Sequence, residues 1–340
     1  MSYDVIIVGA GAAGIAAARR LHDAGKRVVV LEARARIGGR AWTTIGAGFP
    51  LDLGCGWLHS ADRNPWCDIA RDLGFPIDKT PPPWTRPSLP IGFAVEDQRA
   101  FRAALDAFYD RVEEAAQTGR DAPASECLPL HGRWNALIET VAGFVAGAEW
   151  ENVSTIDLHR YADTGVNWRV VDGYGALIAR HAAGLDIVLD CPVRRIDHGS
   201  MQVRVETKQG AMTAAAVIVT IPSALIAREG IKFVPSLPEK LAAAAALPLG
   251  HDDKLFLSLA QADAFEIDSR LFGRTDRAGT GAYHMRPFGR PLIECYYGGS
   301  LAEALERSGP QAFFDFAKAE LVDLLGKDFA KRISPIVEHS

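Results

Sequence analysis

The stretch Tyr3-Asp-Val-Ile-Ile-Val-Gly-Ala-Gly-Ala-Ala-Gly14 decides the fold of this chain. Its apolar run predicts a buried strand that enters a glycine-rich turn, and Ile15–Leu21 continues as a helix. Gly9 permits the tight turn, Gly11 lets the backbone approach a pyrophosphate, and Gly14 lets the helix pack closely on the strand. The N-terminus of the helix then presents unpaired N–H groups to the phosphates. This stretch therefore predicts a phosphate-binding turn.

A second strand and an acidic residue complete a βαβ unit. Arg27–Leu31 predicts the strand, and Glu32 follows it where a carboxylate can accept hydrogen bonds from ribose hydroxyls. Gly38–Gly39 brings the chain close to a second face of the pyrophosphate, and Arg40 supplies a planar cation. The alternatives are a glycine turn without a ligand and, for Arg40, a surface arginine. We predict a dinucleotide site, and the carboxylate does not distinguish NAD from FAD.

Composition and charge narrow the class of protein. The 340 residues are 48% hydrophobic and 23% charged, which indicates a soluble globular chain with a sizeable core. The net charge of -5 argues against binding to nucleic acid or to an anionic membrane. No apolar run is long enough to span a bilayer, and the N-terminus lacks the basic region of a signal peptide. The five cysteines show no CxxC spacing, so we expect no metal site and a cytoplasmic location.

The remaining patterns predict a second layer of structure. Four short strands are expected between residues 187 and 221, and the continuous apolar run Ala216–Ile221 is typical of a buried strand that returns to the first sheet. Strands at Lys254–Leu259 and Leu292–Tyr297 and a helix at Gln311–Leu325 suggest a mixed sheet with helices. We therefore predict an α/β fold in which two domains interleave. A Rossmann-type nucleotide-binding domain takes residues 1–75 and 176–250, and an α+β substrate domain takes residues 76–175 and 251–340.

Three further segments resemble the flavin-containing amine oxidases, the family of monoamine and polyamine oxidases. Asp52-Leu-Gly-Cys-Gly-Trp-Leu-His59 resembles the family's flavin-edge segment, and Pro192–Ile196 resembles its adenine-contacting strand. Leu247–Lys254 resembles the segment that carries its flavin-facing lysine. The resemblance covers the chain in the family's order and implies FAD as the cofactor. The FAD contacts that it implies are Gly9, Gly11, Ala13, Gly14, Glu32, Ala33, Arg34, Gly39, Arg40, Leu53, Gly54, Gly56, Trp57 and Val193.

The resemblance also implies the chemistry and its residues. An amine would be oxidised to an imine, O2 would be reduced to H2O2, and Lys254 would hold a water near flavin N5. From the residues alone, Lys254 is either a desolvated functional amine or a gatekeeper on an edge strand. His59 resembles a position of the polyamine oxidases, where it would accept a substrate proton or orient a distal amine. Its alternative is a hydrogen-bonded structural histidine near a turn.

Other side chains have simpler interpretations. Cys55 is expected to pack as a small hydrophobe, and Tyr296 and Tyr297 are expected in the core and wall of the substrate domain. Arg86 and Arg169 are candidates to clamp a substrate carboxylate, and both are equally well interpreted as surface residues. We expect a small-molecule amine and O2 as partners, and neither nucleic acid nor a membrane.

The resemblance implies one departure and leaves alternatives open. The family continues beyond the position of Ser340 with substrate-facing aromatic residues and a helix that faces the flavin pyrimidine. We expect this segment to be supplied by a second chain, to have been removed, or to be lost from a truncated product. The alternative functions are a flavin-dependent amino-acid oxidase, a desaturase-type oxidoreductase, and a truncated non-catalytic nucleotide-binding remnant.

Overall fold

The N-terminal stretch folds as a strand, a turn and a helix, as the sequence predicts. β1 spans Tyr3–Val8 and α1 spans Ala12–Asp23 in the computed structural model, which describes residues 3–339. Ile6 of β1 is buried in one apolar cluster, whereas Ile7 is buried in a second cluster that includes Ile15 of α1. β1 is therefore covered on both faces, which explains why its sequence is apolar without alternation.

β1 lies in a seven-stranded sheet with the order β12–β9–β10–β11–β1–β2–β8. It pairs in parallel with β2 (Val28–Leu31) and with β11, whose second half is the strand predicted from Ala216 onward. The prediction that this strand is buried is wrong, because Ala216 is exposed and the residues from Val217 to Val219 are half-buried. β10 is antiparallel to β9 and β11, so the sheet is mixed. The strands from the middle of the chain are β8 (Ile187–Val188), β9 (Val193–Asp197), β10 (Val203–Thr207), β11 (Gly210–Val219) and β12 (Lys232–Val234). Two separate stretches of the chain therefore build this sheet, which confirms the predicted interleaved α/β fold.

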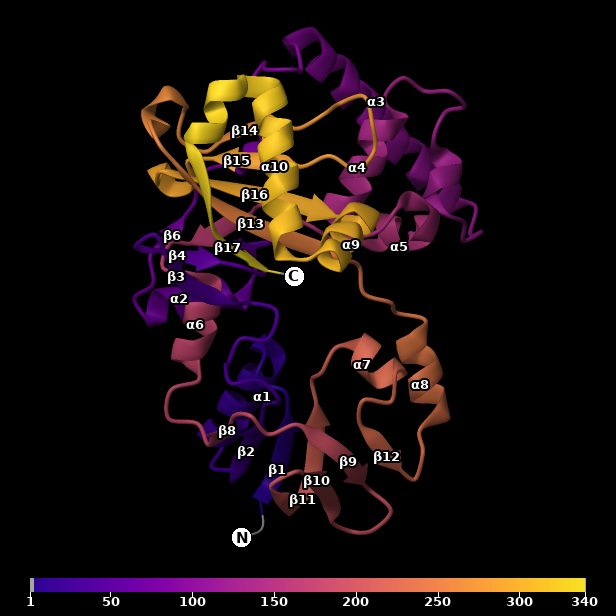
Figure 1. Cartoon of the computed structure of the whole chain (residues 1–340). Helices are drawn as coiled ribbons and strands as arrows, with labels where there is room; N and C mark the ends of the chain where they lie inside the picture. The colour runs from indigo at the N-terminus through magenta and orange to yellow at the C-terminus, as the bar shows by residue number, and fades with distance from the viewer. Residues whose placement is uncertain (1–2, 340) are drawn as a thin grey trace.

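A five-stranded sheet forms the second half of the molecule (Figure 1). Its order is β14–β15–β16–β13–β17, and every neighbouring pair is antiparallel. The strands are β13 (Asp252–Leu259), β14 (Ser269–Phe272), β15 (Ala282–Met285), β16 (Leu292–Gly298) and β17 (Ile333–His339). Because β13 has a neighbour on both sides, the interpretation of Lys254 as an edge-strand gatekeeper is wrong.

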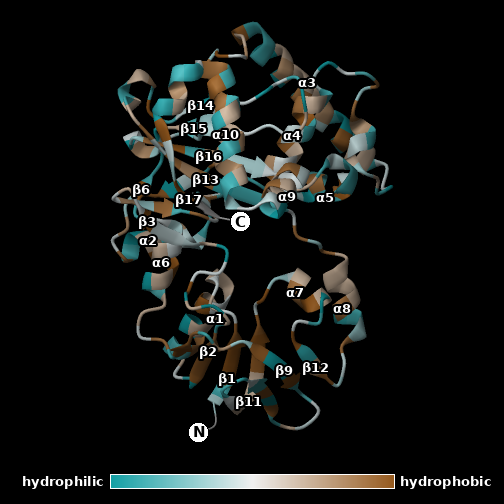
Figure 2. Ribbon diagram, viewed as in Figure 1, coloured by the Kyte–Doolittle hydropathy of each residue, from teal (hydrophilic) through white to brown (hydrophobic). Residues whose placement is uncertain are grey.

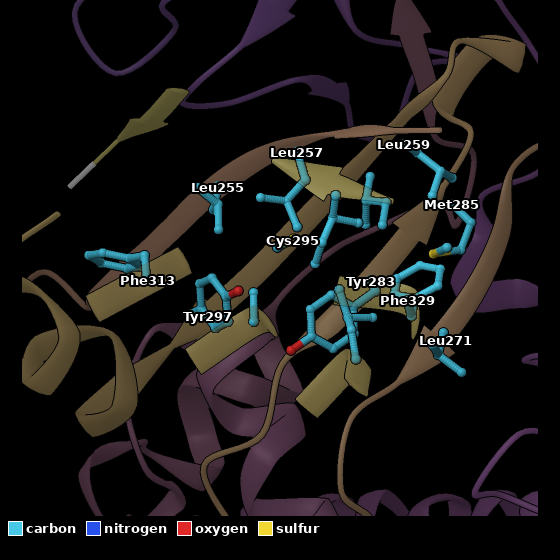
Figure 3. Close-up of a cluster of buried hydrophobic side chains, with 14 of the residues drawn as sticks. Leu255, Leu257, Leu259, Leu271, Tyr283, Met285, Cys295, Tyr297, Phe313 and Phe329 are labelled. Atoms are coloured by element: carbon cyan, nitrogen blue, oxygen red, sulfur yellow. The ribbon is translucent and has the colours of Figure 1, made fainter. Parts of the chain in front are cut away.

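The two faces of the five-stranded sheet differ in character. Figure 3 shows Leu255, Leu257 and Leu259 of β13 on the side of a buried apolar cluster that includes Tyr283 and Phe313. Alternate residues of a strand point to opposite faces, so Lys254 and Phe256 lie on the other face. The apolar cluster thus determines that Lys254 and Phe256 lie on the opposite face of the sheet from the leucines of β13.

Helices cover the sheets and carry most of the polar surface. α10 (Pro310–Leu325) packs its Phe313 and Leu321 into the apolar cluster, and α3 (Val95–Gln117) buries Phe101, Phe108 and Val112 on one face. Figure 2 shows that the strands of the seven-stranded sheet are mostly hydrophobic, whereas the helices are mixed. None of the helices within residues 3–339 combines the length and apolar composition that a bilayer crossing requires. The other helices are α2 (Pro65–Asp72), α4 (Asn135–Ala146), α5 (Thr155–Arg160), α6 (Tyr174–His181), α7 (Ser223–Ala227), α8 (Pro238–Ala245) and α9 (Gly299–Ser308).

Two small sheets lie along the connections between the large ones. β3 (Thr43–Gly46) and β4 (Phe49–Asp52) form a hairpin. β5 (Trp57–Leu58), β7 (Trp168–Val170) and β6 (Ile77–Asp78) form a three-stranded sheet in that order. This sheet joins residues from both sides of the predicted boundary at residue 75, and the domain boundaries themselves stay a prediction.

A close contact between α4 and the end of β16 gives a test of the fold. A Cβ on Gly298 would lie 2.1 Å from the carbonyl oxygen of Gly143, so the backbone would have to shift. We expect Gly298→Ala to lower the free energy of unfolding by about 1–3 kcal/mol through overpacking, measured by urea denaturation. Gly199→Ala is the control, because its Cβ would meet its nearest neighbour at an ordinary 3.5 Å. An equal loss of stability in both variants would contradict this account.

Candidate functional site

The turn after β1 wraps closely around the start of α1. Gly9 has a φ of +105°, and a Cβ on Gly14 would lie 1.9 Å from the carbonyl oxygen of Gly9. Both positions therefore need glycine. The Thr220 hydroxyl donates to the carbonyl oxygen of Val8 at 2.9 Å and also lies 3.2 Å from that of Gly9. This contact holds the turn against the end of β11.

α1 begins without a capping side chain. Gly11 is its N-cap residue, no side chain caps the helix from that position, and the first turn contains no acidic residue. A Cβ on Gly11 would meet only the Cα of Gly39, at 3.8 Å. The first amide groups and the positive end of the helix dipole therefore face an open position that suits a phosphate.

Gly38 and Gly39 lie against this turn, as the sequence predicts. The N–H of Gly38 donates to the carbonyl oxygen of Ala10 at 2.9 Å, and Gly38 forms an isolated parallel bridge with Gly11. The side chain of Arg40 is exposed, and within residues 3–339 its guanidinium has no hydrogen-bond or ion-pair partner. This cation is therefore available to a phosphate group beside the turn.

Glu32 closes the turn from the end of β2. Its carboxylate accepts hydrogen bonds from the N–H groups of Ala10 at 2.7 Å and Arg34 at 2.9 Å. Its backbone carbonyl accepts from the N–H of Cys191 at 2.8 Å, which brings the start of β9, with Val193, to the same strand end. The structure thus brings the predicted ribose and adenine contacts together. The predicted contacts with exposed side chains at this site are Ala13, Ala33, Arg34 and Arg40.

The segment Asp52–Trp57 connects this phosphate-binding turn to the five-stranded sheet. The N–H of Cys55 donates to the carbonyl oxygen of Arg40 at 3.1 Å, and a Cβ on Gly54 would lie 1.8 Å from the same oxygen. At its start, the carbonyl oxygen of Asp52 accepts a hydrogen bond from Lys254 Nζ at 3.1 Å. One short segment therefore touches both the phosphate-binding turn and the predicted catalytic lysine.

The other residues of this segment have distinct environments. Gly56 lies against the lysine, since a Cβ there would be 3.4 Å from Lys254 Nζ. Leu53 is buried with Phe256 in a small apolar cluster. The prediction that Cys55 packs as a hydrophobe is wrong, because its N–H faces Arg40 while its thiol is exposed.

Lys254 is buried and forms an ion pair with Glu294 of β16. Lys254 is only 5% exposed, and its Nζ lies 2.8 Å from Glu294 Oε1. Burial by itself lowers the pKa of Lys254, but the Glu294 carboxylate outweighs it and holds the pKa well above its usual value. Burial raises the pKa of Glu294, whereas Lys254 and His284 bring it well below its usual range. Both partners are therefore charged.

The ion pair continues into a chain of buried charged groups. His284 of β15 places Nδ1 3.4 Å from Glu294 Oε2 and Nε2 2.8 Å from Asp268 Oδ1. Asp268 also accepts from Arg169 at 3.0 Å, and the Arg169 guanidinium reaches Asp78 at 2.6 Å. We refer to Lys254, Glu294, His284, Asp268, Arg169 and Asp78 as the buried ionic chain.

Arg169 brings the buried ionic chain back to the flavin-edge segment. The interpretation of Arg169 as a surface residue is wrong, because it is 4% exposed and pairs with Trp57 across β5 and β7. Its guanidinium lies 5.0 Å from the Trp57 ring and 4.0 Å from the Phe288 ring. A cavity adjoins this contact, and its lining includes Gly56, Trp57, Arg169, Phe256, Phe288 and Glu294.

His59 is not a member of the buried ionic chain. It is exposed, and its Nδ1 lies 2.6 Å from Oδ1 of Asn167. This contact is what we expect if His59 is a hydrogen-bonded structural histidine, and the catalytic role of His59 stays a prediction.

Sequence reasoning missed Glu294, His284 and Asp268. For His284 and Glu294 the available signal was one ionisable residue inside each of the apolar strands at residues 282–285 and 292–298, whereas Asp268 lies outside both strands and had no such signal.

A family model described as flavin containing amine oxidoreductase matches residues 12–142 and 131–338. The chain belongs to this family. Its FAD cofactor fits the phosphate-binding turn, because the uncapped α1 amides, the glycine contacts and Arg40 suit the pyrophosphate, and Glu32 suits the ribose. This amine oxidoreductase therefore has the recognition elements for the adenosine end of FAD.

Individual relatives agree with the family assignment. Polyamine oxidase 2 of Arabidopsis thaliana is 28% identical over 362 residues, which cover 95% of this chain and 73% of that protein. Lysine-specific histone demethylase 2 of Homo sapiens is 32% identical over 272 residues, 69% of this chain and 32% of that protein. A solved wild-type putrescine oxidase bound to putrescine has the same fold, with a TM-score of 0.73 at 20% identity over 100% of this chain and 84% of that chain.

Glu32 gives a direct test of the dinucleotide site. Glu32→Gln replaces one acceptor oxygen by an NH2 group, so either the buried N–H of Ala10 or the partly buried N–H of Arg34 loses its partner. We expect FAD affinity to fall by about 10–100-fold, equivalent to ~1.4–2.8 kcal/mol, measured by flavin fluorescence titration. Glu239→Gln in the first turn of α8 makes the same change on the surface and should leave affinity unchanged. Unchanged affinity in Glu32→Gln would remove Glu32 from the FAD site.

The buried ionic chain predicts a specific response to acid. Burial raises the pKa of Asp268, but His284 and Arg169 hold it well below its usual value, so its ionised form stabilises the fold. This contribution is present above the unfolded pKa of about 3.9 and is lost as the pH falls below that value. We expect Asp268→Asn to cost about 3–5 kcal/mol at pH 7 and to flatten the loss of stability below pH ~4. Urea denaturation at several pH values measures this.

Asp328→Asn is the matched control for this experiment. Asp328 is exposed, and among residues 3–339 its ion-pair partner is the exposed Lys331. The Asp328→Asn variant should lose stability with falling pH as the unmodified protein does. A steep acid-induced loss in Asp268→Asn equal to that of the unmodified protein would show that Asp268 is not the titrating group.

Proposed function

We propose that this chain, with FAD bound, oxidises a polyamine or another small primary or secondary amine. The amine loses two electrons and two protons to become an imine, and O2 takes up both to become H2O2. Water then converts the imine to a carbonyl compound and releases the amine fragment. The family assignment and the polyamine and putrescine oxidases among the similar proteins support this reaction.

One observation carries the proposal. The Asp52–Trp57 segment contacts Arg40 at the phosphate-binding turn and Lys254 at the buried ionic chain. A dinucleotide held at the turn would extend along this segment toward Lys254 and the adjoining cavity. The aromatic side chains of Trp57, Phe256 and Phe288 line that cavity and would exclude water from an apolar part of the amine.

Each residue of the site has a proposed role. FAD supplies the two-electron chemistry and accepts a hydride equivalent from the α-carbon of the amine. Lys254 would present its N–H groups to a water beside the reacting atoms. His59, at the end of the flavin-edge segment, would orient a distal amine of the substrate.

The amino-acid oxidase alternative needs a free arginine for a substrate carboxylate. Arg169 does not offer one, because Nε and both Nη atoms donate to Asp78 and Asp268. Arg290 also lines the cavity, and its Nη atoms donate to the carbonyl oxygens of Pro50 and Val171. Arg86, the other candidate, donates Nη2 to the carbonyl oxygen of Asp268 and does not line the cavity, while its buried Nε has no hydrogen-bond partner within residues 3–339. The two arginines that line the cavity are thus already paired, which favours a substrate without a carboxylate.

Anaerobic reduction tests the proposed reaction. The FAD-loaded protein is mixed without O2 with putrescine, spermidine, an aryl alkylamine and an amino acid. We expect the flavin absorption band to bleach with at least one amine and not with the amino acid. We expect Lys254→Met to slow this bleaching by at least about tenfold, a loss of ~1.4 kcal/mol of transition-state stabilisation.

Lys240→Met is the control, since Lys240 lies in α8 on the surface. Bleaching with the amino acid alone would support the amino-acid oxidase. Stable FAD binding without bleaching by any substrate would support the non-catalytic remnant, and a wild-type rate in Lys254→Met would remove Lys254 from the reaction.

A further inference from the structure

The surroundings of Lys254 fix both its charge and its direction. Nζ donates to Glu294 Oε1 at 2.8 Å and to the carbonyl oxygen of Asp52 at 3.1 Å, and it lies 4.9 Å from the centre of the Tyr296 ring. All these partners favour a cation. Because Lys254 and Glu294 are both buried, bulk water weakens their attraction much less than it would at the surface.

Glu294 has a second neighbour, His284, on the side away from Lys254. Its second oxygen faces His284 Nδ1, whose other ring nitrogen faces Asp268. Arg169 then binds Asp268 from the other side. Basic and acidic side chains therefore alternate along the buried ionic chain, from Lys254 to Asp78.

We propose that Glu294, supported by His284 and Asp268, is a positioning residue that keeps Lys254 as a permanent ammonium directed at the Asp52–Gly56 backbone. Lys254 is then a fixed hydrogen-bond donor and not the base that removes the proton of the substrate amine. This consequence for catalysis rests on the proposed amine oxidation, whereas the charge of Lys254 does not.

The ammonium state also protects the lysine from the products of the proposed reaction. A neutral amine attacks the carbonyl carbon of an aldehyde, and loss of water gives an imine. An ammonium group has no lone pair for this attack. A neutral Lys254 beside a site that releases carbonyl compounds would be exposed to such condensation, and its pairing with Glu294 prevents it.

The other titratable groups around Lys254 do not replace Glu294. The carboxylate of Asp52 accepts hydrogen bonds from the Thr43 hydroxyl and from the N–H of Tyr174, at the start of α6. Asp252 belongs to the strand of Lys254, and Tyr296 contacts the lysine through its ring and hydroxyl. β17 meets Lys254 through backbone pairing with residue 339. Glu294 is therefore the carboxylate that forms the direct ion pair.

Reductive methylation of the protein without FAD tests the proposal independently of any amine oxidation. Formaldehyde with dimethylamine–borane modifies neutral lysine amines, and peptide mass spectrometry locates the modified residues. In the unmodified sequence we expect Lys254 to stay unmodified at pH 8 while the exposed Lys208 reacts. In Glu294→Gln, we expect Lys254 to react at least about tenfold faster, the effect of one pKa unit.

Two further variants separate charge from damage to the fold. Glu294→Asp keeps a carboxylate and should restore most of the protection. Glu320→Gln makes the same change at another buried glutamate, which binds Thr280 and Tyr283 outside the buried ionic chain, and it should leave Lys254 protected. Reaction of Lys254 in the unmodified sequence, or equal protection in Glu294→Gln, would overturn the proposal.

A measurement on the unmodified sequence covers the case in which Glu294→Gln does not fold. Lysines labelled with 13C at Cε are followed by NMR from pH 7 to pH 11, and the Lys254 signal is assigned by its loss in Lys254→Met. Surface lysines should titrate near pH ~10.4, and Lys254 should still be charged there. A Lys254 signal that titrates with or before the surface lysines would contradict the permanent ammonium.

Discussion

The ion pair between Lys254 and Glu294 is the interaction on which the rest of the site depends. Moving two charges out of water costs several kcal/mol per ion, and their attraction offsets that cost only when the geometry is good and the remaining polar atoms are bonded. Here Nζ has a second acceptor in the Asp52 carbonyl, and the second oxygen of Glu294 lies 3.4 Å from His284 Nδ1. This requirement explains why several strands each contribute one buried charged residue to the same face of the sheet.

The apolar face of the five-stranded sheet holds this arrangement in register. Glu294 lies opposite Phe256 on β13 and opposite His284 on β15, so Lys254 is its diagonal neighbour. A slip of one residue would turn Lys254 toward the apolar cluster, where Leu255 and Leu257 now pack. The hydrophobic cluster and the ionic chain therefore enforce the same register, one by burial and the other by pairing.

Local patterns predicted the parts of the molecule whose contacts are close in sequence. The βαβ unit with Gly9, Gly14 and Glu32 was predictable because each residue has a local backbone role, and the helix predicted at Gln311–Leu325 is observed as α10. Lys254 was found through a family resemblance and not through its contacts. Glu294 and His284 were missed because their partners depend on the pairing of three strands, which alternation along a single strand does not specify.

The flavin-edge segment connects the phosphate-binding turn to the buried ionic chain, so that the two form one site. Its middle is fixed on Arg40 by a backbone hydrogen bond and by the close approach of Gly54, and its start is fixed on Lys254. Farther along the segment, Trp57 pairs with Arg169, which binds Asp78 at the other terminus of the buried ionic chain. A displacement of the ionic chain would therefore move the segment relative to the phosphate-binding turn. The protein contacts that connect the phosphate-binding turn to Lys254 therefore continue through charged, buried side chains.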